Sequence, residues 1–326
     1  MSRIQGKTTS PQLPGDPVYV GVDVSKSHLD VHFHPSGVTQ RVTNDKIGLQ
    51  MLVRLLRSCA PQLIVLEATG QYHRLAHRHL HDAGFSLAVV NPFRTRRFAD
   101  MLGQLAKTDR IDARTLALYA AMVRPGAKAP SAPDQADLAA LLVARRQVSR
   151  QRALLRNQMD STGHSLVRRQ IRARIAMSDR HLAALDGEVR LMVHSRPDLR
   201  HRYEILTSVP GIGMITAATM IAELAELGDA KASQIAALVG VAPMNCDSGA
   251  FRGQRRIRGG RASVRNTLYM AALAAVRSNQ QIATFYKRLR DGGKPFKVAI
   301  TAVIRKLAII ANTLITENRK WETTRP

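Results

Sequence analysis

Four acidic residues in the first third of the chain have the types and positions needed to hold metal ions. Asp23 lies in a segment that alternates like a β-strand, and Glu67 ends a short apolar run. Asp109 and Asp112 are three residues apart at a helix start and therefore share one helix face. Carboxylates carried on two strands and a helix can converge on two Mg²⁺ ions, which would stabilise both oxygens of a phosphodiester transfer.

Each acidic position also has a simpler explanation. Asp109 and Asp112 suit a helix N-terminus with Thr108 as its cap, and Asp23 fits the Gly-x-Asp phosphate loop of actin-like ATPases and sugar kinases. An unpaired carboxylate in a core is costly, however, which makes Asp23 and Glu67 unusual as structural residues. The order Asp, Glu, Asp-x-x-Asp in a basic chain favours metal-dependent chemistry on nucleic acid.

The elements around these residues predict an α/β domain. The segment 19–34 alternates around a Ser-Lys-Ser turn and predicts a hairpin, and Asn44 is the expected cap of an amphipathic helix. Further strands are expected at 38–43, 63–69 and 86–91, and helices at 45–58, 71–83, 93–103 and 109–124. Three strands followed by alternating helices and strands are typical of a ribonuclease-H-like, or RuvC-like, fold.

Charge points to a polyanionic partner. The chain has 49 Lys and Arg against 24 Asp and Glu, a net charge of +25. Residues 1–125 carry 16 basic and 9 acidic residues, so most of the excess lies in 126–326. Such a potential attracts phosphate backbones, and arginine suits bidentate phosphate contacts.

Other features exclude several classes. Cys59 and Cys246 are far apart, which excludes a zinc knuckle or disulfide framework and fits a reducing bacterial cytoplasm, where the protein would be nucleoid-associated. No apolar run approaches the ~20 residues of a membrane span. The first 17 residues read as a flexible tail rather than a signal peptide.

The rest of the chain predicts a linker and two helical regions. Residues 125–133 are rich in Pro and Ala, and 134–195 lacks proline and has a helical period that Thr162 and Gly163 break into a hairpin. The segment 206–224 resembles a helix-hairpin-helix, whose glycines allow backbone N–H groups to approach a phosphate. The expected nucleic-acid contacts are Arg145, Arg146, Arg150, Gly211, Gly213, Arg252, Arg255, Arg256, Arg258, Arg261 and Arg265.

Several motifs together resemble a known family. GVDVSK (21–26), LEATG (66–70), AKTDRIDA (106–113), VPGIG (209–213) and LVGVAP (238–243), followed by DSG and an Arg-rich loop, occur in order over about 18–320. They resemble the insertion-sequence family numbered 110, the DEDD transposases described as bridge-RNA-guided serine recombinases.

The resemblance implies a RuvC-like domain at 18–124, a linker at 125–133, a helical coiled-coil region at 134–199 and a mostly α-helical transposase domain at 200–326. It implies a Mg²⁺-binding tetrad and a serine nucleophile, with a noncoding bridge RNA that pairs with donor and target DNA. It also implies dimers that join into a tetramer. The residues so implied are Asp23, Glu67, Asp109, Asp112 and Ser248.

A second serine is an alternative to Ser248 as the nucleophile. A serine hydroxyl needs activation and cationic groups around the phosphate to act as a nucleophile, and the glycines and arginines after Ser248 suit that role. Ser263 also lies in the Arg-rich stretch, and a loop serine most often makes only a local turn bond. The alternatives are a junction-resolving nuclease that uses water, an actin-like ATPase and a non-catalytic nucleic-acid-binding protein.

Overall fold

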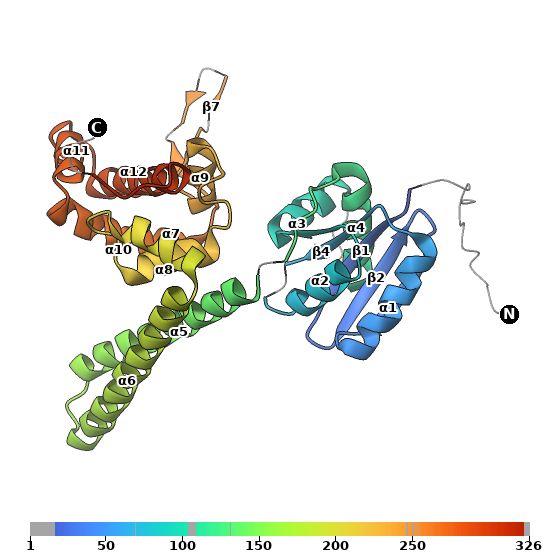
Figure 1. Cartoon of the computed structure of the whole chain (residues 1–326), viewed down its shortest axis with the longest axis horizontal. Coiled ribbons are helices and arrows are strands. Elements are labelled where there is room, and N and C mark those ends of the chain that lie inside the picture. Colours follow the sequence, from blue (N-terminus) through green and yellow to red (C-terminus); the bar gives the residue numbers. More distant parts are fainter. Residues whose placement is uncertain are drawn as a thin grey trace. The chain divides into compact units, whose positions relative to one another are not determined.

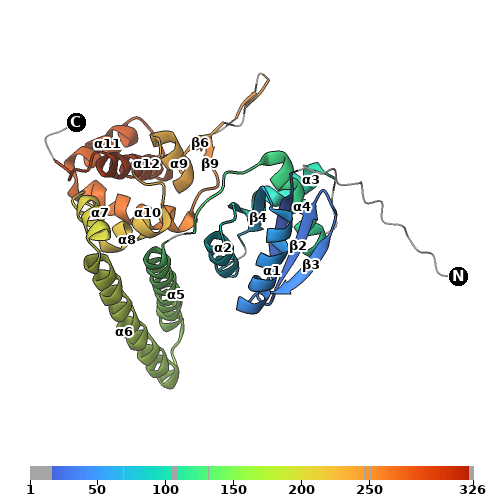
Figure 2. The same ribbon diagram turned by 45° about the vertical axis from the view of Figure 1, so that its right-hand side comes forward.

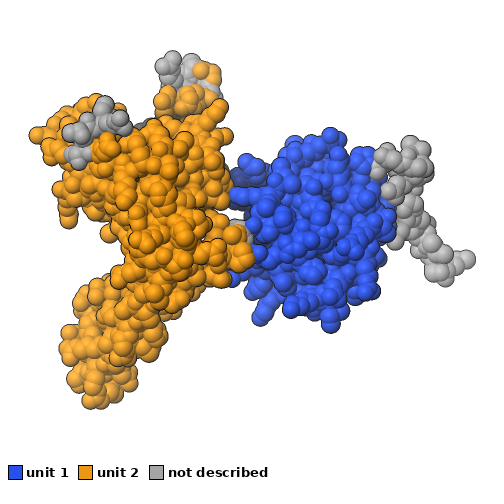
Figure 3. All heavy atoms as spheres, in the orientation of Figure 1, with its two compact units in different colours: residues 1–131 blue, residues 132–326 orange. Residues whose placement is uncertain are grey.

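A computed structural model describes residues 17–68, 70–103, 109–130, 132–245, 247–249, 251–253 and 255–322, without the side chains of 109–111, 248, 251 and 252. The tail expected at 1–17, apart from Pro17, and the expected cap Thr108 lie outside the described residues. The chain forms two compact units, Met1–Ser131 and Ala132–Pro326 (Figure 3). The boundary falls within the stretch expected to be a linker.

The first unit is a five-stranded mixed sheet covered by helices on both faces (Figure 1). The strand order is β3-β2-β1-β4-β5; β1 is antiparallel to β2 and parallel to β4. Its elements are β1 (Tyr19–Val24), β2 (His28–His34), β3 (Thr39–Thr43), α1 (Lys46–Cys59), β4 (Leu63–Glu67), α2 (His73–Asp82), β5 (Leu87–Val90), α3 (Pro92–Met101) and α4 (Asp109–Val123). The mixed α/β fold expected from the strand pattern is confirmed.

The alternation of side chains along each strand divides the core of this unit in two. Val20 and Val22 of β1 pack with α1 and α2 on one face of the sheet. Tyr19 of β1 and Val65 of β4 lie on the other face, with Phe98 of α3 and the apolar side of α4. The odd-numbered residues of β1 and β4 therefore point toward α3 and α4.

The predicted cap of α1 was wrong by one residue. The Asp45 carboxylate, not Asn44, accepts the Gly48 N–H at 2.8 Å and caps the helix. Asn44 Nδ2 instead donates to the Ser25 carbonyl at 2.9 Å and to the Tyr72 carbonyl at 3.2 Å. Asn44 thus joins two loops, a long-range role that local pattern does not reveal.

The second unit is mostly helical. Its elements are α5 (Pro133–Ser161), α6 (Ser165–Ser195), α7 (Pro197–Thr207), α8 (Met214–Glu223), α9 (Ala232–Val239), β6 (Pro243–Met244), β7 (Asp247–Ser248), β8 (Phe251–Arg252), β9 (Arg256–Ile257), α10 (Ala262–Ser278), α11 (Gln280–Asp291) and α12 (Phe296–Thr316). Helices α5 and α6 form the expected hairpin, which breaks at Thr162 and Gly163 (Figure 2). Leu138 of α5 and Val189 of α6 join one core with α7–α12, so the hairpin belongs to this unit.

Helix α12 corrects the expectation that no apolar run has the length of a membrane span. It has 21 residues and a mean hydropathy of 1.8 over its most apolar window, enough to cross a membrane by length and composition alone. Half of that window is buried inside the protein, where Val303 and Leu307 belong to the core of the second unit. Its apolar character is explained by this core position.

Candidate functional site

Two of the predicted metal ligands lie at matching ends of neighbouring strands. In the parallel pairing of β1 with β4, Val22 is opposite Leu66, so the next residues along, Asp23 and Glu67, stand side by side. Both point to the face covered by α3 and α4, because their chain neighbours pack on the other face. The strand pairing alone brings these two carboxylates to one edge of the sheet.

Helix α4 begins near the same edge. A Cβ atom at Gly21 would lie 2.1 Å from the Ala113 carbonyl oxygen, so the α4 backbone rests directly on β1. The Arg124 guanidinium, just beyond the end of α4, lies 5.8 Å from the centroid of the Tyr19 ring at the start of β1. The helix therefore runs antiparallel to β1, and its first turn, which contains Asp112, lies at the Asp23 end.

Glu67 has a partner that the sequence did not reveal. The Thr95 hydroxyl donates to Glu67 Oε2 at 2.8 Å, and Thr95 is buried. The Asn91 side chain caps α3 by accepting from the Phe93 N–H at 2.8 Å, which sets the position of the turn that carries Thr95. Thr95 thus fixes the orientation of the Glu67 carboxylate. The Asn-Pro pair at the helix start was the only local signal for it.

A fifth carboxylate lies next to Asp23. Asp30 of β2 is directly opposite Asp23 in the antiparallel pairing, so both side chains emerge on the same face. Asp30 is buried, and Arg41 of β3 holds it with two hydrogen bonds of 2.9 Å each. This bidentate ion pair neutralises the carboxylate that would otherwise repel Asp23.

The donor set at this edge suits hard cations. Carboxylate oxygens are the ligands that Mg²⁺ prefers, and Asp23, Glu67 and Asp112 supply them. Within the described residues, no three His, Cys, Asp or Glu side chains are close enough together to hold one metal ion. The Asp109 backbone begins α4, but its side chain lies outside the described residues. The four-carboxylate site therefore stays a prediction.

In the second unit, Ser248 lies on a short antiparallel ribbon. Strand β7 pairs with β8, Ser248 opposite Phe251, and Gly249 has a φ of +54° in the turn between them. Strand β6 pairs with β9 through Met244 and Arg256, and Figure 1 shows the β7 ribbon projecting from the helices of its unit. The side chains of Ser248 and Arg252 lie outside the described residues.

Five of the arginines expected to bind nucleic acid lie between β8 and the first turn of α10, and they fall into two groups. Arg255, Arg256 and Arg258 are exposed. Arg261, in contrast, makes two hydrogen bonds to Glu226, at 2.6 and 2.8 Å, and Arg265 donates to the Gly259 carbonyl at 2.7 Å. These last two hold the start of α10 and the loop before it.

The two glycines before α8 also differ. Gly211 has a φ of +104°, and a Cβ there would lie 2.5 Å from the Ala275 Cβ. Close packing against α10 thus requires this glycine. Gly213 is the N-cap of α8, and a Cβ there would meet no atom within 4 Å. Only Gly213 has the open surroundings expected for an approach to phosphate.

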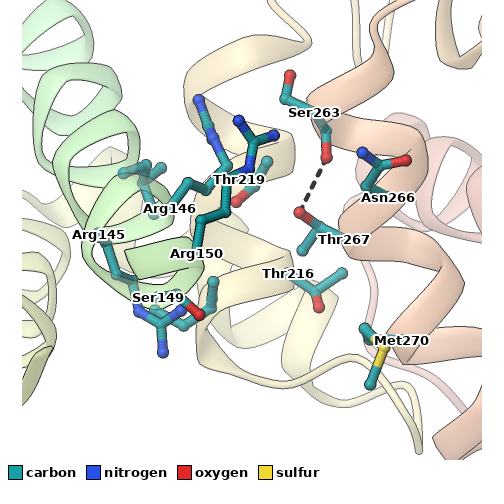
Figure 4. A pocket seen from close by; sticks show the side chains of 12 residues that line it. Arg145, Arg146, Ser149, Arg150, Thr216, Thr219, Ser263, Asn266, Thr267 and Met270 are labelled. Atoms are coloured by element: carbon teal, nitrogen blue, oxygen red, sulfur yellow. Dashed lines mark hydrogen bonds between the residues drawn. The ribbon is translucent and has the colours of Figure 1, made fainter. Parts of the chain in front are cut away.

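Three arginines of α5, Arg145, Arg146 and Arg150, line a cavity of about 400 Å³ in the second unit. Arg145 is paired with Asp186 of α6, and Arg146 donates to Glu223 of α8 at 2.6 Å. Arg150 makes no ion pair or hydrogen bond to any residue that the structure describes. Figure 4 shows Arg146 and Arg150 on the side of the cavity that faces Ser263 of α10.

Ser263 has a clear structural partner. Its hydroxyl donates to Glu223, the same carboxylate that accepts from Arg146. The Thr267 hydroxyl donates to the Ser263 carbonyl at 2.9 Å. Ser263 therefore helps to join α5, α8 and α10, a role that accounts for its position near the arginines.

An α/β unit with carboxylates at one sheet edge, joined to a strongly basic helical unit, is typical of an enzyme that acts on nucleic acid. Comparison with known proteins identifies more narrowly which class of enzyme this is. Residues 20–163 match a DEDD transposase model of the IS110 type, described as "Transposase", and residues 203–287 match "Transposase IS116/IS110/IS902 family".

Similar proteins agree with these matches. The "Pilin gene-inverting protein" of Moraxella bovis is 28% identical over 321 residues, which cover 93% of this chain and 97% of that protein. The "Insertion element IS900 uncharacterized 42 kDa protein" of Mycobacterium paratuberculosis is 33% identical over 141 residues, covering 40% of this chain and 35% of that protein. These comparisons support a DNA transposase or recombinase of the IS110/IS116/IS902, DEDD type.

Proposed function

We propose that the protein cuts and rejoins DNA strands at the ends of a mobile element, with a covalent phosphoserine intermediate, under the guidance of a noncoding bridge RNA. The observation that carries the proposal is the placement of Asp23, Glu67 and the first turn of α4 at one edge of the sheet. The serine nucleophile and the bridge RNA in this proposal rest on the motif resemblance. The near full-length similarity to the Moraxella proteins favours strand exchange over simple hydrolysis.

The proposed metal ligands are Asp23, Glu67, Asp109 and Asp112. A bound pair of Mg²⁺ ions would supply charge stabilisation for the phosphodiester oxygens. The residues of the chain have their own tasks. Thr95 orients Glu67 through its hydrogen bond, and Arg41 compensates the negative charge of Asp30 beside Asp23. The negative charge that remains at this sheet edge is then that of the proposed ligands.

In the proposed reaction, Ser248 Oγ attacks the phosphorus atom of a DNA phosphodiester. A new Oγ–phosphorus bond forms, one phosphorus–oxygen bond of the strand breaks, and the serine proton passes to the departing strand oxygen. A hydroxyl from another strand then attacks the phosphoserine, which restores the serine and makes the new phosphodiester. The linkage conserves the energy of the broken bond, which hydrolysis would lose. The exposed Arg255 and Arg256 lie near Ser248 in sequence, where arginine forks suit phosphate.

The proposed partners are element and target DNA, the bridge RNA and further copies of the chain, as dimers that join into a tetramer. The carboxylates and Ser248 lie in different compact units. Active sites composed of residues from two subunits would let both act on one phosphate. Sequencing of RNA that co-purifies with the protein tests the RNA partner directly.

The decisive experiment traps the protein–DNA adduct. Wild-type protein, with Mg²⁺ and a DNA substrate carrying the element end, should give an adduct that survives denaturing electrophoresis. Ser248→Ala should bind nucleic acid and lose both the adduct and recombination, whereas Ser263→Ala should retain both. Asp23→Asn should fold, bind and form no adduct. An adduct in the Ser248→Ala protein would show that another residue is the nucleophile. Recombination or cleavage without any adduct would indicate a junction endonuclease that uses water.

A further inference from the structure

The cavity between α5, α8 and α10 has the composition of a binding site. Its volume of about 400 Å³ lies within the usual range for ligand pockets, about 300–1,000 Å³. Its polar lining comes from three helices that the core of the second unit holds together. The lining residues with polar side chains are Arg145, Arg146, Ser149, Arg150, Thr216, Thr219, Ser263, Asn266 and Thr267.

Three hydroxyl groups in this lining have no hydrogen-bond partner among the described residues. Ser149, Thr216 and Thr219 make no hydrogen bond to a described residue. Elsewhere in the same unit, helical hydroxyls bond to the carbonyl four residues earlier, as Thr207 does with Tyr203 and Thr301 with Lys297. Thr219 is 1% exposed and lines the cavity, so a ligand bound there would be placed to accept a hydrogen bond from its hydroxyl.

The three arginines of the lining differ in whether an acidic residue pairs with them. Arg145 and Arg146 are held by Asp186 and Glu223, which satisfies those acids and leaves the guanidinium groups in place. Arg150 adds a positive charge that no described acid neutralises. An anion that accepts hydrogen bonds from both hydroxyls and a guanidinium complements this lining, and a phosphate has that chemistry.

We propose that this cavity holds one phosphodiester of a nucleic-acid strand, with Arg150 as its unpaired cation and Thr216 and Thr219 as hydroxyl donors. Met270, 63% exposed at the rim, offers apolar surface to the sugar or base beside that phosphate. Figure 4 shows Arg150 and the two threonines in the wall opposite α10. The proposal rests on the proposed function only in that the chain binds nucleic acid.

The chain offers a matched control for each variant. Arg156 is exposed on α5 like Arg150 but does not line the cavity. Thr301, whose hydroxyl bonds to Lys297, is a control for Thr219. Arg150→Gln and Arg156→Gln change the net charge equally, and Thr219→Val and Thr301→Val each replace a hydroxyl with a methyl group of similar size.

The test measures binding of a fluorescein-labelled oligonucleotide in DNA and RNA versions, without divalent metal, over a series of salt concentrations. Arg150→Gln should weaken binding about tenfold, or about 1.4 kcal/mol, and lower the salt slope by ~0.7 for a single strand or ~0.9 for a duplex. Arg156→Gln should change binding much less. Thr219→Val should melt at or above the wild-type temperature, yet bind more weakly than Thr301→Val. The strand type with the larger loss identifies the source of the phosphate.

A walk of single methylphosphonate substitutions along the oligonucleotide gives a second readout. One position should weaken binding to the wild-type protein but cause no further loss with Arg150→Gln, because both changes remove the same contact. Equal salt slopes for Arg150→Gln and Arg156→Gln, or no such position, would overturn the proposal. These binding measurements do not depend on cleavage. They can therefore support or refute the phosphate site independently of the proposed reaction.

Discussion

Replacing Gly21 by alanine tests whether the contact between α4 and β1 positions Asp112. Gly21 lies in the middle of β1, where α4 crosses the strand. An alanine Cβ would lie 2.1 Å from the Ala113 carbonyl oxygen and 2.3 Å from the Ala117 nitrogen. Both are backbone atoms within a regular helix, so rotation of a side chain cannot relieve the contact. The helix must move away as a body.

The size of the movement follows from these distances. Real Cβ atoms essentially never approach another heavy atom closer than 3.0 Å, so α4 must retreat by about 0.9 Å at Ala113. Overpacking of this kind typically costs about 1–3 kcal/mol of stability. A misplacement of ~1 Å at a catalytic group can cost about 100-fold in rate, and Asp112 immediately precedes the displaced residue. We therefore expect a modest loss of stability and a large loss of metal-dependent cleavage.

The assay compares Gly21→Ala with Gly48→Ala. A Cβ at Gly48 would also lie 2.1 Å from a backbone oxygen, that of Thr43, but α1 packs on the opposite face of the sheet from α4. Both variants should therefore lose stability in thermal unfolding. Only Gly21→Ala should lose cleavage per folded molecule and bind Mg²⁺ more weakly in calorimetry. Equal cleavage by the two variants, after correction for the folded fraction, would refute the positioning role of α4.

Two further predictions concern the first unit. Arg41→Met should leave Asp30 without its partner and destabilise the unit by about 1–3 kcal/mol, and Asp30→Asn in the same chain should restore most of that loss; chemical denaturation of both variants checks this, and no recovery would contradict it. Burial lowers the pKa of His77 below its ordinary value of 6.5, although the hydrogen bond to the Lys128 carbonyl opposes the shift. The folded state thus favours the neutral ring, so stability is present above about pH 6.5 and is lost as the pH falls through the lowered pKa; His77→Gln should melt with a smaller difference between about pH 7.5 and 5.5, and an unchanged difference would assign the dependence to other groups.

Local patterns predicted most elements of the first unit because their causes are local. Alternation along 19–34 marks the strands β1 and β2, although both are buried almost throughout. The continuous apolar run before Glu67 reflects a strand covered on both faces. The cap of α1 failed because Asn44 and Asp45 are both good N-caps. The choice between them depends on Ser25 and Tyr72, which are distant in sequence.

The partners at the candidate site were not predictable for the same reason. Asp30 meets Asp23 only through strand pairing, and Arg41 meets Asp30 only because β3 follows in register. Thr95 reaches Glu67 across 28 residues of chain. Each contact depends on how two secondary-structure elements are aligned with each other. A sequence pattern shows only the periodicity within a single element.

Charge count alone gave the class of partner but not the residues that contact it. In the second unit, Asp186, Glu223 and Glu226 take up Arg145, Arg146 and Arg261 in ion pairs. Those arginines join helices, and mutation of any of them leaves an acid without its partner, so weaker DNA binding would not identify a contact. Arg150 has no such acid among the described residues, and the hydroxyls of Thr216 and Thr219 in the same lining make no hydrogen bond to a described residue either. Loss of binding on its replacement therefore reports a direct contact, which the surrounding arginines cannot do.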